Sequence, residues 1–111
     1  MWRDDAYLLD ILIAARKVLK YTDGLSRQEF DSSDLVQNAV MRMLEVIGEA
    51  ARRLSEEMRD EHPEVPWAQM IGMRNRLIHE YFRIDADKVW DAVQDDIPAL
   101  ISMVEPLVPP E

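Results

Sequence analysis

One segment of the chain gathers most of the side chains that can do chemistry. Arg74, His79 and Tyr81 fall within eight residues of one another, in a protein of 111 residues that has two histidines and no cysteine. An arginine guanidinium holds phosphate oxygens in a fixed fork, and an imidazole gains and loses protons near neutral pH. These two groups are enough to cleave a phosphodiester by general acid–base chemistry without a metal ion. The remaining sequence is expected to fold into the scaffold that positions this segment.

The spacing of these side chains limits how they can meet. On a regular helix each residue turns by about 100°, so Arg74 and Tyr81 are predicted to share a face, whereas His79 lies about 140° around from Arg74. Either the helix is distorted between Arg74 and His79, or the site is built from more than one helix. A homodimer that places two copies of this helix across a cleft would also supply two imidazoles, one as base and the other as acid. Asn75, one turn before His79, is a candidate to orient its ring.

Ordinary structural explanations for the same residues remain open. Arg74 lies in the apolar stripe of the predicted helix, where its stem can pack while its charged head reaches an acidic neighbour. A single histidine on a helix is commonly a structural or surface residue, and an exposed amide explains Asn75 equally well. Spacing alone does not separate catalysis from these explanations.

The sequence does not indicate other kinds of site. It has no glycine-rich phosphate loop, no His-x-x-x-His pair and no cluster of cysteine and histidine, so we expect neither a metal site nor a cofactor. Glu45 and Glu49 share a helix face but have no histidine nearby, and they are expected to be solvated or paired with Arg52 and Arg53. His62, which stands between a glutamate and a proline, is expected to be an exposed loop residue.

Composition and charge fit one small domain spanning residues 1–111. Apolar residues make up 48% of the chain and there are three glycines, which favours a folded, helix-rich protein. The lack of cysteine, of a signal peptide and of a membrane span fits a cytoplasmic protein that makes no contact with a membrane. A net charge of −9 speaks against broad, nonspecific nucleic-acid binding. Arg74, Arg76 and Arg83 nevertheless form a small basic spot, which suits a confined site.

Hydrophobic periodicity and capping residues predict helices in the first half of the chain. The first helix is expected over about residues 4–21, and residues 26–29 have the form of a capping box that begins a short helical turn. Ser32 or Ser33 is expected to cap a long second helix that reaches about Met58.

Two more helices are predicted in the second half. Pro66 can begin a third helix, and Asp85 is a good N-cap for a fourth that runs through about Val104 with a kink at Pro98. The residues expected to face inward include Leu19 in the first helix and Ile78 in the third. No strand-like alternation is present. The expected fold is therefore all-α: an antiparallel four-helix bundle with a short extra helical turn.

The segment that carries Arg74 and His79 also resembles a known motif. Residues 72–82, Gly-Met-Arg-Asn-Arg-Leu-Ile-His-Glu-Tyr-Phe, are similar to the signature of the HepT-like branch of the HEPN superfamily. In that signature an arginine is followed by four residues, a histidine, one further residue and a tyrosine. Residues 44–51, 65–67 and 84–90 support the resemblance, which spans nearly the whole chain.

The resemblance implies a function and assigns roles to individual residues. It implies a helical bundle that forms a homodimer, with the catalytic Arg74 and His79 of both copies lining a cleft. It further implies a metal-independent ribonuclease that acts as the toxin of a toxin–antitoxin module. The implied partner is a minimal, MntA-like nucleotidyltransferase antitoxin that attaches AMP to Tyr81. Asn75 stands where the family has a supporting polar residue, and Arg76, in the basic spot, is expected to bind the RNA.

A mechanism follows as a hypothesis. His79 helps to deprotonate an RNA 2′-hydroxyl, and Arg74 stabilises the charge that builds on the scissile phosphate. The His79 of the second copy protonates the leaving 5′-oxygen, which leaves a cyclic phosphate end. AMP on Tyr81 would place a phosphate on the face of Arg74, where it competes with the substrate.

Two other functions remain open. The chain can be a helical scaffold without ribonuclease activity that binds a nucleotidyltransferase, a reading that the low positive charge favours. It can also be a structural dimer in which Arg74 only pairs with an acidic residue. Growth arrest caused by this chain alone would support the toxin, and tolerance of Arg74→Lys would support the structural dimer.

Overall fold

The computed structural model describes residues 2–110, and every regular element in that range is helical. The fold has three long helices: α1 (Trp2–Thr22), α3 (Asp34–Arg53) and α5 (Trp67–His79). A fourth rod is built from three consecutive segments, α6 (Ala86–Asp91), the π-helical η2 (Ala92–Asp96) and α7 (Ile97–Val104). Three short helical segments connect these rods: α2 (Arg27–Asp31), α4 (Glu56–Glu61) and η1 (Tyr81–Arg83). A fourth, η3 (Glu105–Leu107), follows α7.

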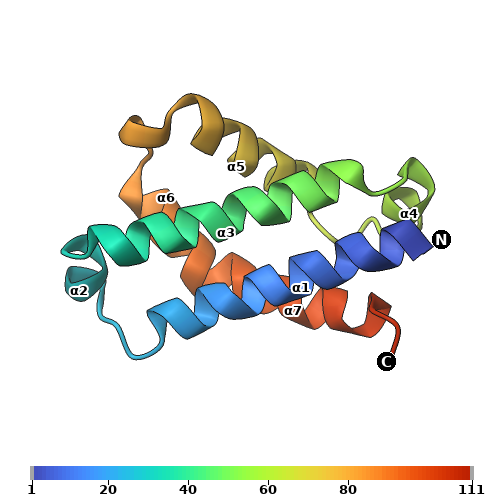
Figure 1. The fold of residues 1–111 in the computed structure, drawn as a ribbon, viewed down its shortest axis with the longest axis horizontal. Helices are drawn as coiled ribbons and strands as arrows, with labels where there is room; N and C mark the ends of the chain where they lie inside the picture. The colour runs from blue at the N-terminus through green and yellow to red at the C-terminus, as the bar shows by residue number, and fades with distance from the viewer. Residues whose placement is uncertain (1, 111) are drawn as a thin grey trace.

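The four rods form an antiparallel bundle with α3 at its centre (Figure 1). Helix α3 packs against α1 on one side and against α5 on the other, and α7 packs against α1. Successive rods run in opposite directions, and the two ends of the chain lie at the same end of the molecule (Figure 1). The predicted all-α bundle is confirmed. Four short helical segments, α2, α4, η1 and η3, accompany the rods in residues 2–110, where the sequence predicted one.

The core is made by the apolar stripes that the periodicity marks. Each such side chain contributes about 1.5–3 kcal/mol when it is fully buried. Its largest fully buried members are Leu8, Ile11, Val18, Phe30, Val40, Leu77, Val89, Val93 and Val104. Two of the predicted inward residues lie outside it: Leu19 is 36% exposed and Ile78 is 47% exposed. Both sit at the border of a stripe, where periodicity leaves the direction of the side chain undecided.

The long second helix of the prediction is in fact two helices. Helix α3 ends at Arg53, and Ser55 caps α4 by accepting a hydrogen bond from the Met58 N–H at 3.1 Å. The buried carboxylate of Asp4 accepts from the Ser55 N–H at 2.9 Å and from the Ser55 hydroxyl at 2.7 Å. Burial by itself would raise the pKa of Asp4, but these hydrogen bonds from Ser55 outweigh it and the pKa is lowered. The contact between α1 and Ser55 therefore fixes where α3 stops and α4 begins.

The other predicted helix ends are largely confirmed. Ser26 and Glu29 form the capping box of α2, Ser33 caps α3, and Asp85 caps α6. Pro98 lies in the first turn of α7, directly after η2. Because proline has no N–H to give to the carbonyl four residues back, the chain accommodates it with a π-helical segment inside an otherwise continuous rod.

Gly48 sets the distance between α3 and α5. A Cβ at this position would lie 2.2 Å from the Cβ of Arg74 and 2.6 Å from the backbone oxygen of Met70. No side chain fits in that space, so the backbone of α3 is in direct contact with α5. The close approach brings Arg74 beside Glu49, the residue that follows Gly48.

Candidate active site

Arg74 is held by a carboxylate from the neighbouring helix. Its Nη2 lies 3.0 Å from Oε2 of Glu49 on α3, and its Nη1 donates to the side-chain oxygen of Asn75 at 2.9 Å. Three-quarters of the side chain is buried. The structural explanation of Arg74 required an acidic neighbour, and Glu49 is that neighbour. The ion pair fixes the position of the guanidinium within a single chain.

Glu49 is shared by three arginines. Its Oε1 is 2.8 Å from Arg52 Nη2 and 2.8 Å from Arg53 Nε, as the sequence predicted, and Oε2 binds Arg74. The hydrogen bonds from Arg52 and Arg53 are the main cause that lowers the pKa of Glu49 to about 2; burial opposes them, and the charges of Arg52 and Arg74 add to the lowering. One carboxylate does not neutralise three guanidiniums, so this cluster is positively charged within a chain of net charge −9. We call Glu49, Arg52, Arg53 and Arg74 the arginine cluster.

His79 stands apart from Arg74. It is the last residue of α5, its side chain is exposed, and it makes no hydrogen bond or ion pair with any residue in the range 2–110. Helix α5 is α-helical from Trp67 to His79, so the distortion considered above is not found between the two residues. A regular helix keeps the two residues about 140° apart around its axis and roughly 7.5 Å apart along it. One chain alone does not bring the imidazole to the guanidinium.

Tyr81 does not share a helix face with Arg74, and that prediction was wrong. Helix α5 ends at His79 with Glu80 as its C-cap, so Tyr81 belongs to the separate turn η1. Its hydroxyl donates to the side-chain oxygen of Asn38 on α3 at 2.8 Å. Asn38 and Glu49 lie on the same side of α3 but roughly 16 Å apart along it, because they are separated by eleven residues. Tyr81 and Arg74 therefore contact α3 at two distant points.

The remaining predicted site residues lie on the exposed side of α5. The side-chain oxygen of Asn75 accepts from Arg74, so the hydrogen bond seen for Asn75 is to the arginine and not to His79. Arg76 is exposed and lines an open depression of about 320 Å³ with Lys88, Asp91 and other residues of α5 and the C-terminal rod. Neither Asn75 nor Arg76 contacts an acidic side chain among the ion pairs of residues 2–110.

Sequence reasoning missed two residues that position the site. Gly48 had no local signal, because a helical glycine reveals its purpose only when the neighbouring helix is in place. Asn38 is an exposed polar residue near the start of α3, and nothing in its surroundings in the sequence links it to Tyr81. Glu49 was recognised only as a surface partner of Arg52 and Arg53, since helical spacing reports contacts within one helix.

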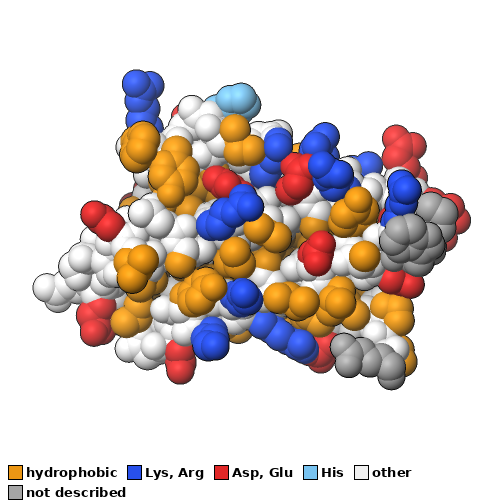
Figure 2. Space-filling model, in the orientation of Figure 1, with side chains coloured by type: hydrophobic (Ala, Val, Ile, Leu, Met, Phe, Trp, Pro, Cys, Tyr) orange, Lys and Arg blue, Asp and Glu red, His pale blue; other side chains and the backbone are white. Residues whose placement is uncertain are grey.

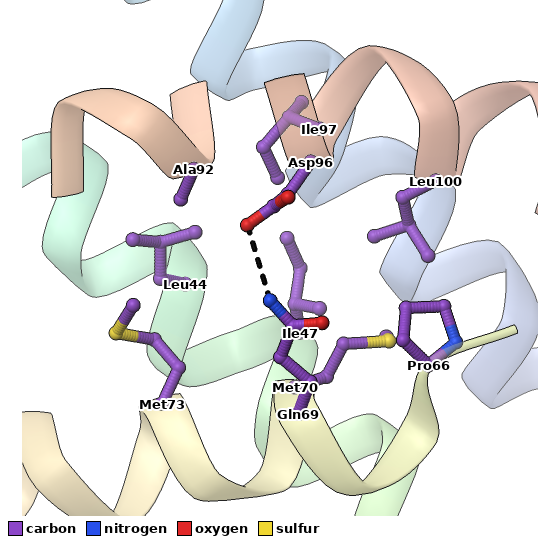
Figure 3. A pocket seen from close by; sticks show the side chains of 10 residues that line it. All are labelled: Leu44, Ile47, Pro66, Gln69, Met70, Met73, Ala92, Asp96, Ile97 and Leu100. Atoms are coloured by element: carbon purple, nitrogen blue, oxygen red, sulfur yellow. Dashed lines mark hydrogen bonds between the residues drawn. The ribbon is translucent and has the colours of Figure 1, made fainter. Parts of the chain in front are cut away.

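A small apolar pocket lies beneath α5 but carries none of the candidate catalytic groups. Its volume is about 50 Å³, and it is lined mainly by apolar side chains of α3, α5 and the C-terminal rod, such as Leu44, Met70, Met73 and Leu100 (Figure 3). At its edge Gln69 donates to Asp96 at 3.3 Å (Figure 3). Burial is the main cause that raises the pKa of Asp96, with smaller effects from Asp95 and Asp91. No group of three or more His, Asp and Glu within residues 2–110 is arranged to hold a metal ion.

Comparison with known proteins places this motif in a family. The profile of the family described as "Ribonuclease HepT-like" matches residues 11–107. The chain belongs to this family. It is 42% identical to "Putative RNase MJ1380" of Methanocaldococcus jannaschii over 90% of this chain and 92% of the relative. It is 39% identical to "Probable ribonuclease HepT" of Thermococcus cleftensis over 91% of this chain and 92% of the relative. No solved structure matches the chain.

The predicted resemblance to the HepT-like family is therefore confirmed over nearly the whole chain. The structure adds that no helix within residues 2–110 is long and apolar enough to cross a membrane.

The lowered pKa of Glu49 predicts how stability depends on pH. Because the pKa falls from an ordinary 4.5 to about 2 in the folded chain, the stabilisation from Glu49 is complete above about pH 4.5 and is lost as the pH falls toward 2. Urea midpoints measured between pH 6 and pH 3 should decline more steeply for the wild type than for Glu49→Gln. Glu57→Gln, a change at an exposed glutamate that forms no ion pair within residues 2–110, should keep the wild-type slope. Equal slopes for wild type and Glu49→Gln would contradict the assignment.

Proposed function

We propose that this chain is a metal-independent endoribonuclease, the toxin of a toxin–antitoxin module, with Arg74 and His79 as its catalytic residues. Family membership supports ribonuclease activity. The observation that carries the proposal is the arginine cluster, a site of positive charge on an acidic protein, with the exposed His79 further along the same helix. A phosphodiester is attracted to the guanidiniums, and an imidazole on the surface is free to exchange protons with it.

The proposed reaction is an internal transfer within the RNA. His79 takes the proton of a 2′-hydroxyl, and the 2′-oxygen forms a bond to the adjacent phosphorus while the bond to the 5′-oxygen breaks. Arg74 stabilises the negative charge on the phosphate oxygens in the transition state. The leaving 5′-oxygen takes a proton from the His79 of a second copy of the chain. The products are a 2′,3′-cyclic phosphate and a 5′-hydroxyl.

A homodimer is part of this proposal because one chain keeps its arginine and histidine apart. Two large apolar side chains flank His79 in the sequence and are exposed: Ile78 at 47% and Phe82 at 96%. Leu35, close in sequence to the Asn38 that binds Tyr81, is 81% exposed. Hydrophobic side chains gather at this end of α5 and along the seam of α1 and α3 (Figure 2). Exposed apolar surface of this kind is typical of contacts between proteins. In the proposed dimer a second copy would cover the apolar side chains at this end of α5, and the two His79 side chains would then come together.

The catalytic assignment predicts a sharp difference between the two histidines. His79→Ala should lower the rate of RNA cleavage about 100-fold or more, since a general acid or base contributes roughly that factor. His62→Ala is the matched control: His62 lies in a loop 3.4 Å from Glu64, and its loss should leave the rate unchanged. Arg74→Lys should also lose most activity, because an ammonium does not reproduce a guanidinium fork. Cleavage of a mixed RNA pool, with analysis of the 3′ ends, measures all three.

Activity in EDTA tests the absence of a metal requirement in the same assay. Full cleavage by His79→Ala would remove the proposed base, and full activity of Arg74→Lys would favour a structural role for Arg74.

The dimer proposal predicts that a charge at the exposed end of α5 breaks the assembly. Phe82→Glu should shift the mass measured by light scattering from two chains to one and abolish cleavage together with it, because a buried unpaired carboxylate is costly. Leu19→Glu makes the same kind of change at an exposed apolar position of α1 and should leave the mass unaltered. If the wild type has the mass of one chain and still cleaves RNA, the composite site is contradicted.

Tyr81 is the proposed point of control by a nucleotidyltransferase antitoxin. The phenol oxygen attacks the α-phosphorus of ATP, loses its proton and releases pyrophosphate, which leaves AMP on Tyr81. Because Tyr81 lies two residues after His79 and next to the exposed Phe82, the added phosphate and base stand at the imidazole end of α5. The modification would then block the RNA path and the dimer contact near His79, rather than compete at Arg74 of the same chain.

This assignment predicts that Tyr81→Phe keeps cleavage but escapes control. With ATP and a minimal nucleotidyltransferase of the proposed antitoxin class, the wild type should gain AMP and lose activity, whereas Tyr81→Phe should gain none and remain active. Tyr21→Phe, at a half-buried tyrosine of α1, should behave as the wild type. Mass spectrometry detects the attached AMP. If Tyr81→Phe protein also gains AMP, the modification site is a residue other than Tyr81.

The Arg74–Glu49 ion pair favours a second candidate, a helical scaffold for the nucleotidyltransferase without ribonuclease activity. In that protein the guanidinium would serve only to join α3 and α5. Purified wild type that accepts AMP but leaves every RNA in the pool intact would establish the scaffold.

A further inference from the structure

Gly72 has no purpose that the described part of the chain explains. Of the three glycines, Gly24 adopts a φ of +73°, which favours glycine, and Gly48 lies against Arg74 and Met70. Gly72 lies in the middle of α5, and a Cβ there would meet no atom within 4 Å. Glycine inside a helix is destabilising relative to alanine. An open stretch of helix backbone without a side chain is useful where another molecule approaches closely.

Gly72 lines an open cleft between α4 and α5. The cleft has a volume of about 930 Å³, within the range of ligand sites. Helix α4 contributes Glu56, Arg59 and Asp60, and α5 contributes Gly72 and Asn75 among others. The amide oxygen of Asn75 accepts from Arg74, so the cleft leads directly to the proposed catalytic arginine.

Arg59 is the cation of this cleft and has no partner within residues 2–110. Its Nε is buried without a hydrogen bond, and no carboxylate of the described residues lies within 4.0 Å of its guanidinium, although Glu56 and Asp60 line the same cleft. Six other arginines pair with acidic groups: Arg16, Arg27, Arg42, Arg52, Arg53 and Arg74. Buried donors nearly always have an acceptor, so the buried Nε shows that the chain itself does not satisfy this guanidinium. A ligand in the cleft cannot reach the buried Nε, but it can offer acceptors to the two terminal nitrogens, which are not among the buried atoms.

We propose that this cleft is a subsite that binds a guanine base of the RNA next to the cleaved bond. A bare phosphate is disfavoured because the carboxylates of Glu56 and Asp60 face the same space. A nucleobase offers acceptors to the arginine and donors to the carboxylates. Guanine satisfies both best: its O6 and N7 match an arginine fork, and its N1–H and amino group donate to a carboxylate. The flat ring can lie over the bare backbone at Gly72.

This inference rests on the proposed ribonuclease function, but binding tests it separately. The probes are four dinucleoside monophosphates, GpU, ApU, CpU and UpU, with a 2′-O-methyl group on the first ribose so that they resist cleavage. Titrated into the full-length protein and followed by NMR at the Gly72 and Asn75 amides, GpU should bind about tenfold or more tightly than UpU. Arg59→Ala should remove this preference, and Arg16→Ala, at an arginine paired with Glu105, should keep it.

Gly72→Ala separates a binding role from a structural one. The alanine should raise the melting temperature, because helix propensity improves and no atom is in its way, while it weakens GpU binding about tenfold. Gly48→Ala should lower the melting temperature, since the added Cβ collides with Arg74 and Met70. A structural role for Gly72 would make both glycine replacements lower the melting temperature.

The outcomes distinguish the two proposals. Selective GpU binding without cleavage of any RNA leaves the subsite standing and overturns the ribonuclease. Cleavage without any difference among the four probes overturns the subsite. The subsite is also overturned if inorganic phosphate displaces GpU at an equal concentration, or if Gly72→Ala separates the dimer, which would assign the glycine to a contact between copies.

Discussion

The ion pair between Arg74 and Glu49 is the contact on which the geometry of the site depends. Arg74 Nη2 on α5 lies 3.0 Å from Glu49 Oε2 on α3. The two groups can meet because Gly48, the residue before Glu49, has no side chain to hold the helices apart. The position of α5 in turn fixes the position of His79, the last residue of this helix. A buried arginine without a partner would be costly, so the helices and the charge are coupled.

The same pair also determines what Arg74 can do for a substrate. A carboxylate that belonged to Arg74 alone would neutralise it, but Glu49 is also bound by Arg52 and Arg53. The arginine cluster therefore keeps a positive charge. In the proposed reaction the ion pair would hold the guanidinium in one position, so that binding a phosphate would cost little further side-chain entropy. Preorganised charge of this kind is effective in catalysis because it does not have to reorient during the reaction.

The sequence predicts contacts within a helix well and contacts between helices poorly. The stripes, the capping box at Ser26 and the Glu49–Arg53 pair follow from short-range spacing, and all are present. The break at Ser55 was missed because the apolar pattern continues past it, while its cause is Asp4, 51 residues away in the sequence. The shared face of Arg74 and Tyr81 failed for a related reason. Neither glycine nor proline marks the end of α5 at His79, so periodicity carried the helix too far.

The separation of His79 from Arg74 is itself informative about assembly. Both residues belong to one regular helix, and no side-chain rotation removes a difference of about 140° around its axis. An enzyme that uses both groups on one phosphate must therefore obtain one of them from another chain, or bend α5. Bending would break the packing of α5 on the backbone of Gly48 and the ion pair beside it. In the proposed dimer a second copy would leave both intact and would cover the exposed Phe82 and Ile78, so association would be the less costly way to complete the proposed site.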